Sequence, residues 1–170
     1  TVLERCLDGV AASGVVDHAV VTVSEDMFRV VTELLAAQRG VWGPMRTDVV
    51  RGGAERADSV LAGLERVEAC CRASRGTGDD LSGVLVAVHD AARCLTPPDM
   101  IASVVEAART GAVEGTWAGA VPVLPVTDTV KIVDTVTGGA LDGATVIRST
   151  PVRDTLRAAQ TPQVFTLSAL

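Results

Sequence analysis

The fold of this chain is decided by Val84-Leu85-Val86-Ala87-Val88-His89-Asp90-Ala91-Ala92-Arg93, an apolar run that ends abruptly in polar residues. A short apolar run with polar flanks predicts a buried strand. In an open α/β sheet, ligands bind beyond the carboxyl ends of the strands, which is where this carboxylate and guanidinium would lie. Carboxylate oxygens suit Mg²⁺, and a guanidinium can hold a phosphate with two hydrogen bonds. The stretch therefore predicts a strand that ends in part of a metal–phosphate site.

Strands and helices alternate around this central strand. Apolar residues at helical spacing predict helices over residues 2–10, after Ser24, over 59–71 and over 99–109. Continuous apolar runs predict strands over residues 18–23, 45–50, 83–88 and 117–123. This alternation indicates βαβ units in an α/β fold with a doubly wound, mostly parallel (mixed) sheet.

Two stretches depart from this alternation. Residues 72–82 are polar and Gly-rich, which predicts a surface loop. Residues 126–150 are rich in Val, Thr, Asp and Gly, which predicts an extended β-arm with one or two turns. A chain of 170 residues can form one domain with a sizeable core, so we expect a single domain over 1–170 that includes this arm.

The overall composition excludes several classes of protein. A net charge of −6 argues against a nonspecific surface for nucleic acid or an anionic membrane. The chain has no apolar run near the ~20 residues that span a bilayer and no signal peptide, so we expect no membrane association and a cytoplasmic location. No Cys-x-x-Cys pair occurs among the four cysteines, and there are only two histidines, which argues against a structural zinc site and for reduced thiols.

A glycine pair marks the turn between the predicted strand over 45–50 and the helix that follows it. Gly52 and Gly53 would let a ligand approach the backbone, and free amides at the helix start can bind an anion or a base edge. Arg56 and Ser59 would lie on one side of the first turn. The alternative is an ordinary strand-to-helix turn capped by Asp58 or Ser59.

The other polar segments leave similar alternatives open. Asp90 and Arg93 can form a local ion pair instead of a ligand site, and His89 is better interpreted as a hydrogen-bonded structural residue. Thr129 and Lys131 alternate onto one face of an extended segment, where a hydroxyl and an ammonium can receive a phosphate. A solvated edge strand would show the same pattern. The last polar segment, Gln160-Thr161-Pro162-Gln163, is either a turn or the lining of a site.

Taken together, these segments resemble a known family. The motifs Gly-Gly-x-x-Arg-x-x-Ser-Val, His-Asp-Ala-Ala-Arg, Pro-Val-x-Asp-Thr-x-Lys and Gln-Thr-Pro-Gln-x-Phe, in this order and spacing, resemble those of the 2-C-methyl-D-erythritol 4-phosphate cytidylyltransferases. The likeness covers essentially all of the chain, and the composition resembles that of actinobacterial members. It implies a Rossmann-like nucleotidyltransferase fold with a protruding β-arm. It also implies a reaction in which CTP and methylerythritol phosphate give CDP-methylerythritol and pyrophosphate, with Mg²⁺ as cofactor, in non-mevalonate isoprenoid synthesis.

The resemblance also implies roles for individual residues. The residues implied for CTP are Gly52, Gly53, Arg56, Ser59, Asp90 and Ala91. Asp90 would bind the Mg²⁺ and is one implied catalytic residue; Arg153 is the other. Arg93, Thr129 and Arg153 would contact the sugar phosphate, with Arg153 reaching it from the neighbouring subunit. This implies a homodimer formed by the arms over residues 132–153.

The chain also departs from the family pattern. It opens on Thr1 within an expected helix and stops at Leu170, so we expect both ends to be shortened relative to the natural protein. The Gly-rich loop with its Arg and Lys, and the substrate-binding segment beyond Phe165, are not in this sequence. Cys94 stands where the family usually has Pro, and Ala54 where it often has Asp. Two alternatives remain: a cytidylyltransferase for another polyol phosphate such as ribitol 5-phosphate, and a noncatalytic nucleotide-binding module.

Overall fold

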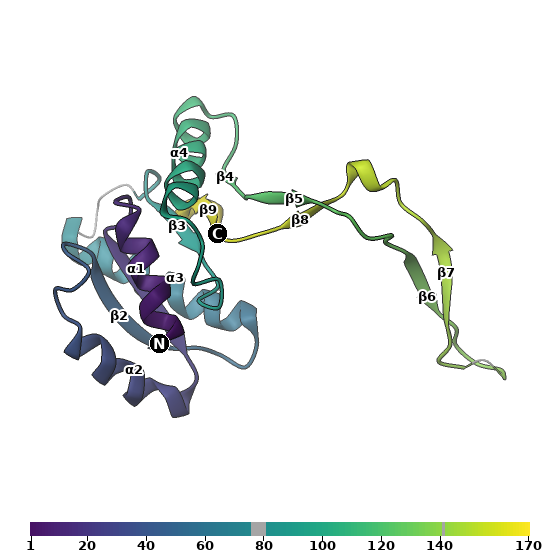
Figure 1. The fold of residues 1–170 in the computed structure, drawn as a ribbon, viewed down its shortest axis with the longest axis horizontal. Coiled ribbons are helices and arrows are strands. Elements are labelled where there is room, and N and C mark those ends of the chain that lie inside the picture. Colours follow the sequence, from purple (N-terminus) through teal and green to yellow (C-terminus); the bar gives the residue numbers. More distant parts are fainter. Residues whose placement is uncertain (76–80, 141) are drawn as a thin grey trace. The chain divides into compact units, whose positions relative to one another are not determined.

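A computed structural model describes residues 1–75, 81–140 and 142–170 (Figure 1). Its elements in chain order are α1 (Val2–Ala12), β1 (His18–Val23), α2 (Glu25–Ala37), β2 (Arg46–Arg51), α3 (Arg56–Arg75), β3 (Leu85–Val88), α4 (Pro98–Glu114), β4 (Gly119–Ala120), β5 (Val123–Pro125), β6 (Ile132–Thr135), β7 (Thr145–Ser149), the 3₁₀ turn η1 (Arg153–Thr155), β8 (Arg157–Ala159), β9 (Gln163–Thr166) and the 3₁₀ turn η2 (Leu167–Ala169). By contacts, these elements form two compact units: residues 1–121 with 161–170, and residues 122–160.

Most of the predicted elements are present, with shifted ends. Helix α1 begins at Val2, so Thr1 is the N-cap and does not lie inside the helix. Helix α3 begins at Arg56 and continues to Arg75, so the start of the expected 72–82 loop is helical. Residues 76–80 of that loop lie outside the described residues. The strand expected over 117–123 is two short strands, β4 and β5.

The first unit begins with a parallel pair of strands covered on both faces. Strands β1 and β2 pair with Val21 opposite Val49 and Val20 opposite Asp48. Because side chains alternate along a strand, Val21 and Val49 face one side, where they pack against the cluster that α1 and α2 complete. Asp48 faces α3, as its contacts with Arg66 and Cys70 on that helix show.

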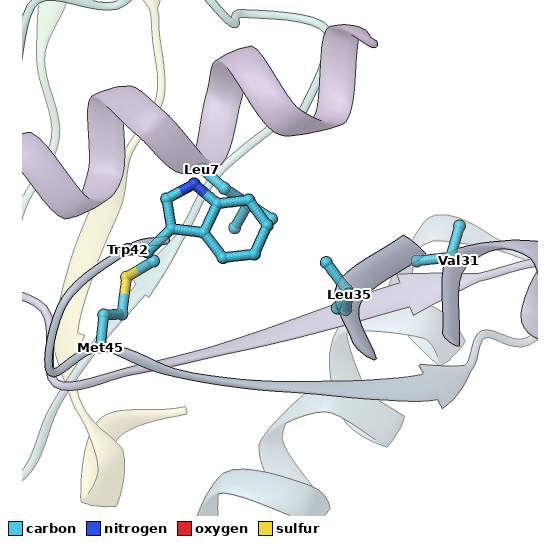
Figure 2. Close-up of a cluster of buried hydrophobic side chains, with 5 residues drawn as sticks. All are labelled: Leu7, Val31, Leu35, Trp42 and Met45. Atoms are coloured by element: carbon cyan, nitrogen blue, oxygen red, sulfur yellow. The ribbon is translucent and has the colours of Figure 1, made fainter. Parts of the chain in front are cut away.

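The cluster between α1, α2 and the strand pair contains the buried side chains of Leu7, Val31, Leu35, Trp42 and Met45. Figure 2 shows the Trp42 indole against Leu7 of α1, with Val31 and Leu35 reaching the cluster from α2. The indole N–H of Trp42 donates to Asp8 Oδ1 at 2.9 Å, so the polar edge of this buried ring is satisfied. The segment before β2 is thereby held against α1, which helps to fix β2 and the turn at its carboxyl end.

A second ladder in the same unit has the order β3–β9–β4, with both pairings antiparallel. Helix α4 packs on it, and Val104, Val105, Ala108 and Val164 form the buried cluster between them. No strand was predicted at β9, because its four residues lie between a Pro-containing polar segment and another turn. The long return of the chain from the arm places β9 between β3 and β4.

The predicted fold class is confirmed: helices and strands alternate in a mixed α/β arrangement. The parallel pair among the described residues is β1–β2, and the antiparallel pairs of the first unit both involve β9. A cavity of about 1130 Å³ lies between β1 and β3, with α1, α3 and α4 contributing to its lining. Among the described residues, no helix has the length and apolar character that crossing a membrane requires.

The second unit, residues 122–160, contains two antiparallel pairs. Strand β5 pairs with β8, and β6 pairs with β7, with a register shift between Ile132 and Val133. All residues of β6 and β7 are exposed. Figure 1 shows the pair as a two-stranded ribbon. This unit contains the predicted β-arm over 132–153. That the two units make up one domain stays a prediction.

Candidate functional site

The turn after β2 and the turn after β3 meet at an ion-pair cluster. Arg56 Nη2 donates to Asp90 Oδ1 at 3.1 Å, and Arg93 Nε lies 3.7 Å from Asp90 Oδ2. Arg56 is the first residue of α3, whereas Asp90 and Arg93 follow β3. The structure therefore brings two of the predicted motifs together at the carboxyl ends of their strands. We call Arg56, Asp90 and Arg93 the Asp90 cluster.

The cluster is accessible to a ligand. The exposed fractions of the side chains are 62% for Arg56 and 43% for both Asp90 and Arg93. Ion pairs this exposed contribute only about 0–1 kcal/mol to stability. Each guanidinium can therefore exchange its contact with Asp90 for a ligand phosphate at little cost. The local ion pair between Asp90 and Arg93, which the sequence offered as an alternative to a ligand site, is present. Its side chains are exposed, as a phosphate-binding site requires.

The glycine pair is fixed by packing against the first turn of α3. A Cβ on Gly52 would collide with the Ser59 side chain, and one on Gly53 would collide with Asp58. The Gly52 N–H donates to the carbonyl of Val23 at 2.8 Å, which ties the turn to the end of β1. Glycine at these positions has a structural reason of its own, and contact with CTP stays a prediction for both.

The start of α3 also uses the capping residues that the sequence analysis considered. Asp58 Oδ2 accepts from the Glu55 N–H at 3.1 Å, which is one half of a capping box. Ser59 Oγ donates back to the Glu55 carbonyl at 3.2 Å. Capping therefore occupies Asp58, while Arg56 is directed to Asp90. The turn is both a capped strand-to-helix connection and one side of the Asp90 cluster.

Thr161 lies in the polar segment for which the sequence left open a turn or the lining of a site, and the structure places it beside Asp90. Its hydroxyl oxygen accepts from the Asp90 N–H at 3.3 Å and lies 3.0 Å from His89 Nδ1. The register that pairs Val88 with Gln163 places Thr161 opposite Asp90 when it is continued past the ends of β3 and β9. Thr161 is 5% exposed, so these hydrogen bonds are shielded from water. No local signal in the sequence could have shown this, because it depends on the β3–β9 register.

His89 has the structural role that the sequence favoured. Burial lowers the pKa of its imidazole, and the nearby Asp90 carboxylate opposes that shift only in part. His89 is therefore neutral near pH 7, and its hydrogen bond with Thr161 orients the backbone from which Asp90 projects.

We predict that Thr161→Val lowers the free energy of unfolding by about 1–2 kcal/mol, because the partly buried Asp90 N–H loses its acceptor. Urea denaturation measures this change. Thr166→Val is the control at a second buried threonine, since the Thr166 hydroxyl accepts from the Ser168 hydroxyl at 3.3 Å and does not contact Asp90 among the hydrogen bonds of the described residues. Equal stability of the Thr161→Val protein and the wild type would contradict the role given to the hydroxyl.

The remaining predicted substrate residues lie in the second unit. Arg153 Nη1 donates to the Thr127 carbonyl at 3.0 Å. Arg153 therefore contacts the extended segment that also contains Thr129. Lys131 Nζ donates to Thr150 Oγ1 at 2.8 Å. Thr129 lies between these two contacts in the chain and is exposed. The roles of Thr129 and Arg153 in binding substrate stay predictions.

Comparison with known proteins shows which family has these motifs. The whole chain, residues 1–170, matches the family described as IspD: 2-C-methyl-D-erythritol 4-phosphate cytidylyltransferase. The chain belongs to this family. The predicted resemblance is confirmed, and the relatives described next are actinobacterial, as expected.

Two relatives with the family's name have similar sequences. The protein from Corynebacterium jeikeium is 49% identical over 174 residues, which are 100% of this chain and 62% of the relative. The protein from Rhodococcus jostii is 45% identical over 170 residues, again 100% of this chain and 60% of the relative. The chain thus spans about three fifths of the length of these cytidylyltransferases.

A solved structure supports the fold. The 4-diphosphocytidyl-2C-methyl-D-erythritol synthase from Anaerococcus prevotii superposes with a TM-score of 0.70 at 23% identity, covering 99% of this chain and 63% of that one. The likeness shows that this chain shares the fold of that protein.

The donor set of the Asp90 cluster fits Mg²⁺. Asp90 offers carboxylate oxygens at an exposed position, and Mg²⁺ is commonly held by one or two carboxylates together with substrate phosphates. The guanidiniums of Arg56 and Arg93 beside it would bind the same phosphates. The site can therefore bind a metal–polyphosphate group through one anionic and two cationic side chains.

Proposed function

We propose that this protein transfers the cytidylyl group of CTP to the 4-phosphate of 2-C-methyl-D-erythritol, releasing pyrophosphate and requiring Mg²⁺. The single observation that supports this most is the Asp90 cluster, in which Arg56 and Asp90 meet from two family motifs at a separation of 3.1 Å. We further propose that the enzyme is a cytoplasmic homodimer whose arms over residues 132–153 embrace each other.

The chemistry needs charge and position more than a nucleophilic side chain. The 4-phosphate oxygen attacks the α-phosphorus of CTP, and the bond to the pyrophosphate oxygen breaks. Arg56 and Arg93 can offset the negative charge that collects on the phosphates. Mg²⁺, which Asp90 would hold, supplies further charge neutralisation when it is bound.

The capped turn after β2 would place the cytosine. Gly52 and Gly53 keep side chains away from the base, and Ser59 and Ala91 complete the proposed CTP pocket. Because Thr161, in the segment that leads into β9, holds the Asp90 backbone, the carboxylate that would bind the metal is positioned before substrate arrives. Preorganisation of this kind is the contribution of the scaffold to the rate.

Pyrophosphate release by the full-length protein with CTP and Mg²⁺ tests the proposal. Methylerythritol 4-phosphate and ribitol 5-phosphate are compared as acceptors. Release only with methylerythritol 4-phosphate supports the proposed reaction. Release only with ribitol 5-phosphate would identify a different polyol phosphate as the substrate. Binding of CTP without release from either acceptor would favour a noncatalytic nucleotide-binding module.

We predict that Arg153→Ala raises the KM for methylerythritol phosphate about tenfold, because one charge-assisted hydrogen bond to the phosphate is lost. The KM for CTP should change little. Arg157→Ala is the control in the same segment, since Arg157 Nη1 donates to the nearby carbonyls of Asp154 and Leu156. A defect confined to CTP would show that Arg153 is not on the acceptor side.

A further inference from the structure

A second group of ligand atoms lies on the face of β1 and β2 that α3 covers. His18 Nε2 is 3.0 Å from Asp48 Oδ2, and Cys70 Sγ is 3.6 Å from the same oxygen. The three ligand atoms all lie within 4.8 Å of one another. His18 is the first residue of β1, whereas Asp90 and Gly52 lie beyond the carboxyl ends of strands, so this group is separate from the Asp90 cluster.

The fold explains why these residues meet. In the parallel pair, Asp48 is opposite Val20, so His18 is its diagonal neighbour on the same face. Cys70 comes from α3, one turn after Arg66, which also contacts Asp48. The side chains of His18 and Asp48 are 14% and 31% exposed, and Cys70 is half-buried. The ligand atoms are therefore held by three different elements and partly shielded from water.

We infer that His18, Asp48 and Cys70 form a zinc-binding site, which the spacing of cysteines and histidines in the sequence did not indicate because the three residues come from separate elements. Zinc accepts imidazole nitrogen, carboxylate oxygen and thiolate sulfur at about 2.0–2.3 Å, which separates tetrahedral ligand atoms by about 3.3–3.8 Å. The distances from Asp48 Oδ2 to His18 Nε2 and to Cys70 Sγ, 3.0 and 3.6 Å, are close to that range. Mg²⁺ prefers oxygen alone, so the sulfur and nitrogen select against it. A fourth position stays open for water.

Arg66 is the competitor of the metal. Its Nη2 lies 2.9 Å from Asp48 Oδ2, the oxygen that the zinc would take. The Arg66 side chain is 44% exposed, so it can turn into solvent when a metal binds. Removing the guanidinium should consequently strengthen zinc binding, whereas removing the thiol should weaken it.

The test is a zinc titration of the metal-free, full-length protein by calorimetry, repeated with Co²⁺ to detect thiolate ligation by its charge-transfer absorption. We expect one equivalent of zinc, with excess Mg²⁺ having no effect. Cys70→Ser should weaken binding by about 100-fold or more, since even the loss of a residue that supports a ligand costs about 10- to 100-fold. Arg66→Ala should strengthen it about two- to fivefold, the factor that an exposed ion pair represents.

Cys71→Ser is the matched control, because Cys71 is the next residue of the same helix and is not in the cluster. Thermal unfolding of each variant without metal shows whether it is folded. The inference is overturned if the wild type binds no zinc, if Cys70→Ser binds as tightly as wild type, or if Cys71→Ser is impaired equally. The zinc site is independent of the proposed transferase activity. Asp90→Asn, which should lower that activity, should leave the zinc titration unchanged.

Discussion

Replacing Asp90 with asparagine is expected to lower kcat for pyrophosphate release by about 100-fold or more. The amide has the size of the carboxylate but no charge, so it binds Mg²⁺ poorly and no longer pairs with Arg56. The remaining activity should need a higher Mg²⁺ concentration. Steady-state rates over a series of Mg²⁺ concentrations measure both effects.

The fold of the Asp90→Asn protein should be intact. Both ion pairs of Asp90 are exposed, and pairs of this kind add little to stability. The N–H that donates to Thr161 belongs to the backbone and is unaffected by the substitution. Asp99→Asn, the same change of charge at an exposed position in the first turn of α4, is the control. Unchanged activity and Mg²⁺ dependence of Asp90→Asn would disprove the metal assignment.

The largest loss of stability is expected for Gly119→Ala. Gly119 on β4 is opposite Phe165 on β9, and the phenylalanine ring lies across it. A Cβ at this position would collide with the Phe165 ring and with the carbonyl oxygen of Val164. The carbonyl belongs to a strand between two partners and cannot easily move away. We expect a decrease of about 2–3 kcal/mol in the free energy of unfolding, the upper part of the range for overpacking.

Urea denaturation compares Gly119→Ala with Gly83→Ala. A Cβ on Gly83 meets nothing within 4 Å, so that control should differ from wild type by less than about 0.5 kcal/mol. If both variants were equally stable, the close approach of β4 to β9 would not be what requires glycine at position 119. Nucleotide binding by Gly119→Ala below its melting temperature would show whether the damage reaches Asp90 through β9.

The elements formed by local patterns were predicted well. Helix α2 follows Ser24 and strand β1 covers the expected residues, because each has a periodicity that a short window of sequence contains. The helix predicted over 59–71 is shorter than α3. The hydrophobic periodicity of α3 is weaker than that of α1 or α2, and its N-terminal capping begins at Glu55. Strand β9 was missed because four residues bounded by turns have no distinctive pattern.

The sequence by itself determined the family, the fold class and the two turns that form the Asp90 cluster. Each motif is a continuous stretch whose chemistry depends on nearest neighbours, such as the glycines that fit against Asp58 and Ser59. The tertiary structure alone decided that Arg56 reaches Asp90, that Thr161 holds the Asp90 backbone, and that His18, Asp48 and Cys70 come together. These contacts join residues 22 to 71 positions apart, so they exist only when strand register and helix packing bring distant segments within hydrogen-bond distance.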